Sequence, residues 1–195
     1  MLKKTIAVVS MLLVICIAFF AASTVPGYAE KQKEEQRQAN EEIGVNAYQK
    51  LNAYLANKNA EVQTAEQADA ENDTAILFAV YAGAYINDEG NLIVNITDTS
   101  DEIQDELAQA TDNAPIAYQI VEKSLAELQE VYGILSAHLT EAPYFEAVLS
   151  ETKNTVEVYT EEDINICTAY VEKLVNLSAV EIIPKKNQFT DYTKV

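Results

Sequence analysis

The first long apolar stretch covers residues 5–22, an uncharged run that follows Lys3 and Lys4. A basic start, an apolar run and small residues at Gly27 and Ala29 are typical of a secretory signal peptide cut after Ala29. Because the run is near the minimum length for a spanning helix, an uncleaved N-terminal membrane anchor is the alternative. Both interpretations place the rest of the chain outside the cell, either secreted or at the cell surface.

The next segments are polar and then amphipathic. Residues 30–40 are charged and rich in Gln without an apolar period, which favours a solvated tether or a frayed helix start. Helical spacing then predicts an amphipathic helix over about 40–57, with Asn57 and Asn59 as stop signals. Residues 61–73 are acidic and rich in Ala, as in a helix or a linker. The helix carries a stripe of Ile43, Ala47, Leu51 and Leu55, with Tyr48 and Tyr54 beside it.

A period of two replaces the helical period from Ile76 onward and predicts a β-hairpin. The turn is "NDEGN", residues 87–91, which holds the Asn, Asp and Gly that tight turns require. A strand over 76–86 enters this turn and a second strand leaves it. The residues expected on one face are Phe78, Val80, Ala82, Ala84 and Ile86, followed by Leu92, Val94 and Ile96 on the return strand.

A short helix and a third strand are expected after this hairpin. Thr99 and Glu102 have the spacing of a capping box, which marks a helix start. The helix would bury Ile103, Leu107 and Ala110 on one face. Residues 116–121 then have the character of a strand.

A second capping box, Ser124 with Glu127, starts a helix that bridges to the rest of the chain. This helix is expected to end before Pro143. Its apolar residues recur at three- and four-residue steps: Leu125, Leu128, Tyr132, Leu135 and Leu139.

The order of hairpin, helix and strand then repeats. Strands are expected over 144–149 and 155–159, joined by the turn "SETKN". Thr160 is expected to cap a helix whose first turn carries the acids of residues 161–163, where the helix dipole favours negative charge. One face of this helix holds Ile164, Cys167, Val171, Leu174 and Val175, and the closing strand before Pro184 holds Val180, Ile182 and Ile183.

These patterns predict an α+β protein with an internal duplication. "YINDEGNLIVNITDTSDEI" and "VLSETKNTVEVYTEEDINI" align turn on turn. Each half makes a small sheet with one apolar face and a helix to cover it, so the fold class is two hairpin-helix-strand (ββαβ) modules. The expected divisions are a signal peptide (1–29), a charged tether and amphipathic helix (30–75), a first module (76–122), a bridging helix (123–142), a second module (143–184) and a C-terminal tail (185–195).

The charge is strongly acidic, with 13 basic and 31 acidic side chains and a formal charge of −18. Loss of Lys3 and Lys4 with the leader would leave 11 basic side chains against the same 31 acids, a formal charge of −20. Like charge repels nucleic acid and anionic lipid, so neither is expected as a partner. Two interpretations stay open: the charge attracts a basic protein, or it only keeps an exported protein soluble.

No catalytic constellation or cofactor motif is visible in the sequence. Only Cys167 remains after processing, so no intrachain disulfide forms, as suits export from a Gram-positive-type bacterium. Cys167 lies on an apolar stripe and is expected to be a buried hydrophobe, without a metal site. His138, the one histidine, lies near a helix end and lacks a nucleophile context. The interpretation is a non-enzyme without cofactor or metal, although abundant carboxylates leave a glycosidase pair or weak calcium binding open.

Four segments together resemble a known family. "YAGAYINDEGNLIVNITD" is similar to the opening hairpin in the pro-regions of α-lytic protease and streptogrisin-type serine proteases. "KSLAELQEVYGILS" resembles that family's bridging helix, "YFEAVLSETKNTVEVYT" its second hairpin, and "ICTAYVEKLVNLSAVEII" its last helix and strand. The resemblance covers residues 79–183, although Tyr144 and Phe145 stand where the family has a Trp.

The resemblance implies a pro-domain that assists the folding of a secreted chymotrypsin-like serine protease and inhibits it. In that family the second sheet pairs with a protease hairpin and the following tail enters the active-site cleft. Because this chain stops at Val195, about where the protease would begin, we expect action in trans. A stand-alone surface or structural module and a fragment of a longer precursor are the alternatives, and the oligomeric state is left open. The expected contact residues, with the tail over 187–195, are Tyr144, Phe145, Val148, Val156, Val158, Tyr159, Phe189 and Tyr192.

Overall fold

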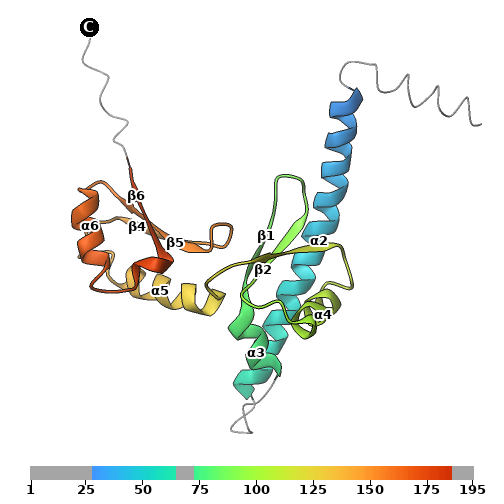
Figure 1. Cartoon of the computed structure of the whole chain (residues 1–195), viewed down its shortest axis with the longest axis horizontal. Coiled ribbons are helices and arrows are strands. Elements are labelled where there is room, and N and C mark those ends of the chain that lie inside the picture. The colour runs from blue at the N-terminus through green and yellow to red at the C-terminus, as the bar shows by residue number, and fades with distance from the viewer. Residues whose placement is uncertain (1–27, 65–72, 186–195) are drawn as a thin grey trace, which may run out of the picture.

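The computed structural model describes residues 28–64 and 73–185, which form a mixed α+β protein with two three-stranded sheets and five α-helices (Figure 1). Most of the expected signal peptide and of the C-terminal tail, including Phe189 and Tyr192, lies outside these residues. The elements in chain order are α2 (Tyr28–Thr64), α3 (Asp73–Val80), β1 (Tyr81–Ile86), β2 (Leu92–Ile96), α4 (Asp101–Ala110), β3 (Ile116–Ile120), α5 (Leu125–Ala137), β4 (Glu146–Ser150), β5 (Thr155–Thr160), α6 (Ile164–Val171), a 3₁₀ helix (Leu177–Ala179) and β6 (Val180–Pro184).

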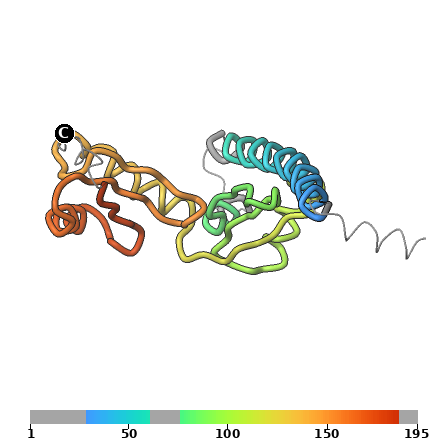
Figure 2. The backbone as a smooth tube through the Cα atoms, turned by 90° about the horizontal axis from the view of Figure 1, so that it is seen from above, coloured from blue at the N-terminus to red at the C-terminus, as the bar shows by residue number. Residues whose placement is uncertain are grey.

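The two sheets share one topology. The strand orders are β1-β2-β3 and β4-β5-β6, and in each sheet the first pair is antiparallel and the second pair is parallel. A parallel pair needs a crossover, which α4 supplies in the first sheet and α6 with the 3₁₀ helix in the second. We call α2 to β3 the first lobe and α5 to β6 the second lobe; Figure 2 shows them side by side.

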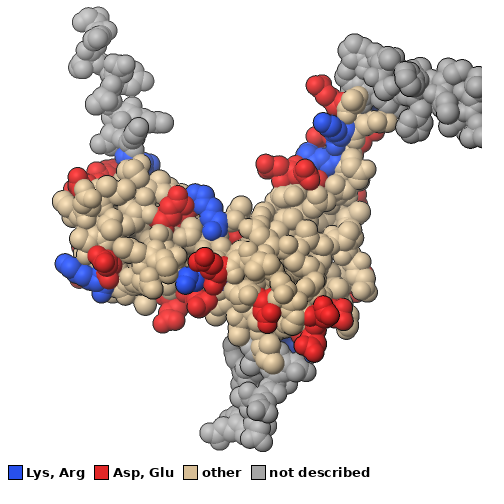
Figure 3. All heavy atoms as spheres, viewed as in Figure 1, with Lys and Arg blue, Asp and Glu red and all other residues tan. Residues whose placement is uncertain are grey.

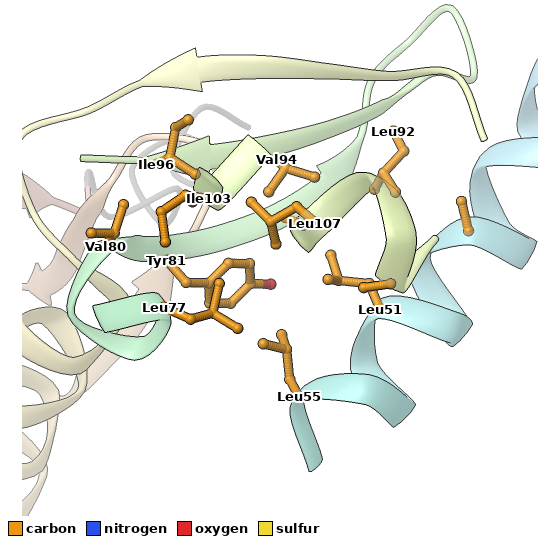
Figure 4. Packing of buried hydrophobic residues seen from close by; sticks show 13 residues of the cluster. Leu51, Leu55, Leu77, Val80, Tyr81, Leu92, Val94, Ile96, Ile103 and Leu107 are labelled. Atoms are coloured by element: carbon orange, nitrogen blue, oxygen red, sulfur yellow. The ribbon is translucent and has the colours of Figure 1, made fainter. Parts of the chain in front are cut away.

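The first lobe packs α2, α3 and α4 onto one face of its sheet (Figure 4). Alternate residues of β2 point into this core, and Asn95 between them points to the opposite face. The core side chains buried to 9% exposure or less include Leu51, Leu55, Leu77, Tyr81, Leu92, Val94, Ile96, Ile103 and Leu107. The predicted apolar face of α4, including Ala110, is confirmed.

The second lobe has its own core between α5, α6 and the inner face of its sheet. Leu125 at the start of α5 packs against the first core, whereas Leu128 and Leu135 are fully buried in the second. The helix therefore connects the two cores directly. The remaining buried members of the second core are Tyr144, Val156, Val158, Cys167, Val171 and Ala179.

The predicted bounds of the N-terminal helix, about 40–57, are too short at both ends, and the helical alternatives for residues 30–40 and for the start of 61–73 are the ones observed. Residues 30–40 are helical, and α2 continues past Asn57 and Asn59 to Thr64. Arg37 pairs with Glu34 and Glu41 on the same helix face, at one-turn spacing that supports an exposed helix without an apolar stripe.

The predicted apolar stripe of α2 also differs from the buried positions observed in the helix by one residue. Ile43 is 47% exposed, and Gly44 takes the buried position. A Cβ on Gly44 would lie 2.7 Å from the Gly90 carbonyl oxygen, so glycine lets α2 pass directly beside the first hairpin turn.

The first strand begins later than predicted, because Asp73–Val80 is helix α3. Phe78 and Val80 therefore belong to a helix, and the strand alternation starts only at Tyr81. A short apolar run such as "AILFAV" satisfies both periods, so its pattern alone does not separate buried helix from buried strand.

The helix starts were predicted with mixed success. The Ser124–Glu127 capping box is confirmed, with both reciprocal hydrogen bonds present. The residue that precedes α4 is Ser100 rather than Thr99, and its side chain makes no capping bond. Asp163 caps α6 instead of Thr160, so residues 161–163 precede the helix, and Leu174 and Val175 follow it.

Candidate partner-binding surface

The second sheet has one face that no helix of the described residues covers. Val156 and Val158 point into the core, so the residues that alternate with them point outward. Strand register places Val148 and Glu181 beside Glu157, and Glu146 and Ile183 beside Tyr159, on the same side. We call these residues the outer face: Glu146, Val148, Glu157, Tyr159, Glu181 and Ile183.

An ion-pair network lies at one end of the outer face. Lys153 Nζ lies 2.6 Å from Glu157 Oε1 and 3.0 Å from Glu181 Oε2, and the Tyr159 hydroxyl donates to Glu157 Oε2 at 2.9 Å. The hydrogen bond from Lys153 lowers the pKa of the Glu157 carboxyl. The same network raises the pKa of Lys153, so both groups stay charged at neutral pH.

The sequence-predicted contact residues divide between core and surface. Tyr144, Val156 and Val158 are buried, and the Tyr144 hydroxyl donates to the Leu135 carbonyl oxygen at 2.8 Å. Burial raises the pKa of Tyr144 to about 12. The side chains of Tyr144, Val156 and Val158 pack in the core, because each faces the helices rather than the outer face. Phe145 is 42% and Val148 36% exposed, and Tyr159 is half-buried.

The exposed aromatic of this group lies just before an edge strand. β4 pairs only with β5 within the described residues, so its other edge carries unpaired backbone groups. Phe145, just before β4, donates its N–H to the Tyr159 carbonyl oxygen and its ring faces Lys185 Nζ at 4.6 Å. An edge with apolar side chains beside it is a surface on which an added strand can pair.

The turn after β4 holds the two lobes together through a contact that the sequence patterns did not predict. Glu151 Oε2 accepts a hydrogen bond from the Ala84 N–H at 2.7 Å, and Asn95 Nδ2 donates to the Glu151 carbonyl oxygen at 2.6 Å. The pairing of β1 with β2 shifts register between Tyr81 and Ala84, which is the mark of a bulge. The sequence contains one sign of this contact: Gly83 lies inside a strand, where glycine often marks a bulge or the close approach of another segment.

A second pair of bonds fixes the other end of the same turn. Asn154 Nδ2 donates to the Lys123 carbonyl oxygen at 2.7 Å, and the Lys123 N–H donates to Asn154 Oδ1 at 3.0 Å. Asn154 has φ of +53°, a left-handed conformation that Asn tolerates better than most residues. The turn is thus bonded both to the first sheet and to the segment before α5.

The two residues with the clearest catalytic chemistry, Cys167 and His138, are used structurally. Cys167 is buried, and burial raises the pKa of its thiol. His138 caps the carboxyl end of α5, with Nδ1 2.8 Å from the Ile134 carbonyl oxygen. In the described ranges, no three His, Cys, Asp or Glu side chains gather as metal ligands. Acidic and basic side chains are interspersed over both lobes on the face in Figure 3, with acids in excess.

Within residues 28–64 and 73–185, we found no helix with the length and apolar character needed to span a bilayer. Residues 27–120 match a family model described as a Pro-like N-terminal domain. The matched range begins one residue before α2 and ends with β3, so it corresponds to the first lobe. The match supports a relationship to pro-domains in general and does not specify a protease type. No curated protein matches the chain.

Proposed function

We propose that the chain is an exported, non-enzymatic protein that binds a secreted chymotrypsin-like serine protease in trans, as an inhibitor or folding helper. The observation that carries this proposal is the outer face of the second sheet, which no helix of residues 28–64 and 73–185 covers, beside an edge of β4 that no strand of these residues pairs with. Main-chain pairing at such an edge supplies affinity, and Phe145 and Val148 supply apolar contacts. The match of residues 27–120 to a pro-like domain supports a pro-domain role.

The formal charge of −20 after leader cleavage, from 11 basic and 31 acidic side chains, favours a protease with a basic surface, because an acidic surface accelerates association with a basic protein and repels nucleic acid. The proposal includes a cleaved leader and a duplicated module. Both sheets share strand order and pairing sense, which supports duplication. Mass spectrometry of the protein in the culture medium tests the leader: a chain that begins at Glu30 supports cleavage, and an intact leader on the cells supports an anchor.

The central experiment measures refolding and inhibition. The exported chain is added to a denatured, co-encoded chymotrypsin-like protease, and to the native protease with a peptide substrate. We expect a higher yield of refolded activity, slower substrate hydrolysis, or both. If the chain changes neither, the action in trans is wrong.

A pair of variants tests the surface. V148K places a charge at the centre of the proposed contact, and we expect at least about tenfold weaker inhibition, equal to about 1.4 kcal/mol. I120K is the matched control, since Ile120 is an exposed strand residue of the first lobe. Loss with I120K and not with V148K would place the contact on the first lobe instead.

The alternative function is a stand-alone surface or structural module, or part of a longer precursor. The observation that favours it is the ion-pair network, because Lys153 already pairs with both Glu157 and Glu181 without a partner protein. Immobilised chain incubated with medium from the same culture separates the two functions. Specific recovery of a protease supports the proposal, and its absence from repeated captures supports the stand-alone module.

A further inference from the structure

A cavity of about 330 Å³ lies where the two lobes meet. α2, α3 and β1 of the first lobe line it together with α5 and the turn after β4. Its apolar wall includes Phe78 and Leu125, and its polar groups include Tyr48, Tyr81, Gln129 and Glu151. This volume is at the lower end of the range for small-molecule sites, large enough for a short side chain or a small amine.

The cavity has a single formal charge among its lining residues, the Glu151 carboxylate. Glu151 is half-buried, and its Oε2 accepts the hydrogen bond from the Ala84 N–H. No Lys, Arg or His of the described residues forms an ion pair with it. The charge of this carboxylate is therefore available to pair with a cationic ligand, and a partly buried ion pair is less screened by water and salt than an exposed one.

The tyrosines strengthen the preference for positive charge. Burial, and then the charge of Glu151, raise the pKa of Tyr81, so its hydroxyl is neutral at physiological pH. Its ring and those of Tyr48 and Phe78 line the same space, and aromatic faces attract cations.

The amino end of α5, with Lys123 just before it, could favour an anion instead. Glu127 caps that end, because its carboxylate accepts hydrogen bonds from the N–H and hydroxyl of Ser124. These bonds lower the pKa of Glu127, so it stays ionised and offsets the positive end of the helix. Glu151 therefore remains the one charged group among the residues that line the cavity.

We infer that this junction cavity binds an alkylammonium or guanidinium group, with the cation at Glu151 and its aliphatic stem along Phe78 and Leu125. The group can come from a free amine or from a Lys or Arg side chain of another protein. The Glu151 carboxylate also accepts the hydrogen bond from the Ala84 N–H, so binding of the cation would change the environment of the contact that joins the lobes.

The experiment is a nuclear magnetic resonance titration of the ¹⁵N-labelled full chain at neutral pH. The ligands are n-butylammonium, its neutral isostere n-butanol, and short capped peptides with a central Lys or norleucine. We expect saturable shifts of the Gly83 and Ala84 amide signals with the cationic ligands, with a dissociation constant on the order of 1 mM for the amine. Saturable shifts with both n-butylammonium and the Lys peptide would show that the site recognises the alkylammonium group itself. Saturable shifts with the Lys peptide alone would show that the cation comes from a protein side chain.

E151Q is the test variant, since the amide oxygen keeps an acceptor for the Ala84 N–H while the charge is lost. We expect binding about tenfold weaker in E151Q, as for loss of a charge-assisted bond, and unchanged in E130Q, an exposed glutamate of α5. Equal binding of n-butanol and n-butylammonium, no saturable shift at 50-fold excess, or unchanged binding in E151Q would each overturn the inference.

Discussion

The Glu151 carboxylate accepts a hydrogen bond from the main-chain N–H of Ala84 at 2.7 Å, across the junction of two separate cores. The N–H is available because β1 is an edge strand of the described sheet and Ala84 opposes Val94 in a non-hydrogen-bonded pair, so its N–H points away from β2. Gly83, directly before it, has φ of +103°, and a Cβ there would lie 2.7 Å from Glu151 Cγ. The positive φ favours glycine, and a Cβ would also displace the Glu151 side chain, so this position influences how the second hairpin contacts the first sheet.

Substitution of Gly83 by Ala should therefore destabilise the protein and loosen the junction. The positive φ alone costs about 1–2 kcal/mol for an L-residue, and the clash with Glu151 adds to it. We expect the free energy of unfolding, measured by urea titration, to fall by about 2 kcal/mol or more. The Ala84 amide should also exchange its hydrogen faster.

Gly133 provides the matched control, because a Cβ there would meet nothing within 4 Å. It lies inside α5, where Ala is a better helix former than Gly, so G133A should stabilise by about 0.5–1 kcal/mol. If G83A left both the urea midpoint and the exchange rate of Ala84 unchanged, the contact with Glu151 would not exist in solution.

Two substitutions of Asn154 separate the contribution of its hydrogen bonds to Lys123 from the contribution of its left-handed backbone conformation. N154A loses both hydrogen bonds to Lys123 and places an unfavourable residue at φ of +53°, so we expect a loss of about 2–3 kcal/mol. N154G loses the bonds but tolerates the backbone, so its loss should be about 1 kcal/mol smaller. Urea titrations of both variants check this. Equal losses would mean that the backbone conformation contributes nothing, and no loss in either would contradict the contact.

Local patterns predicted most of the sheet structure of this chain and one of its three expected helix caps. Leu92, Val94 and Ile96 are buried and lie at every second position, as in a strand with one buried face. The cap of α5 is encoded locally as well, because Ser124 and Glu127 lie within four residues. The extent of α2 was missed because its first half has no apolar stripe; the helix depends on pairs such as Arg37 with Glu41.

The candidate surface was predicted only in part. The sequence identified the second hairpin, but it did not separate Val156, which faces the helices, from Val148, which faces outward. The contact of Glu151 with Ala84 joins residues 67 positions apart, and no local period encodes it. Gly83 is the one local trace of that contact, and a glycine in a strand marks a bulge or a close approach without naming the residue that approaches.

Acid should weaken the outer-face network through Glu157. Its pKa is lowered from the ordinary 4.5 in the folded protein because Lys153 donates a hydrogen bond to it. A group with a lowered folded pKa contributes stability above its unfolded pKa and loses it as the pH falls through the folded value. We therefore expect the free energy of unfolding to fall as the pH is lowered below about 4.5, and to fall less steeply in E157Q. Thermal unfolding at several pH values measures both slopes; parallel slopes would contradict the role of Glu157, and E130Q serves as the control.

The two helix starts that follow serine residues give a direct comparison of capping within one protein. The Ser124 hydroxyl accepts a hydrogen bond from the Glu127 N–H, and the Ser124 N–H donates one to the Glu127 carboxylate, whereas the Ser100 side chain makes no capping bond. S124A should cost about 1–2 kcal/mol in the free energy of unfolding, because it leaves an amide donor at the start of α5 unpaired. S100A should change it by less than about 0.5 kcal/mol. Since α5 connects both cores, S124A should lower the urea midpoint of the whole protein, and equal effects of the two substitutions would contradict the capping assignment.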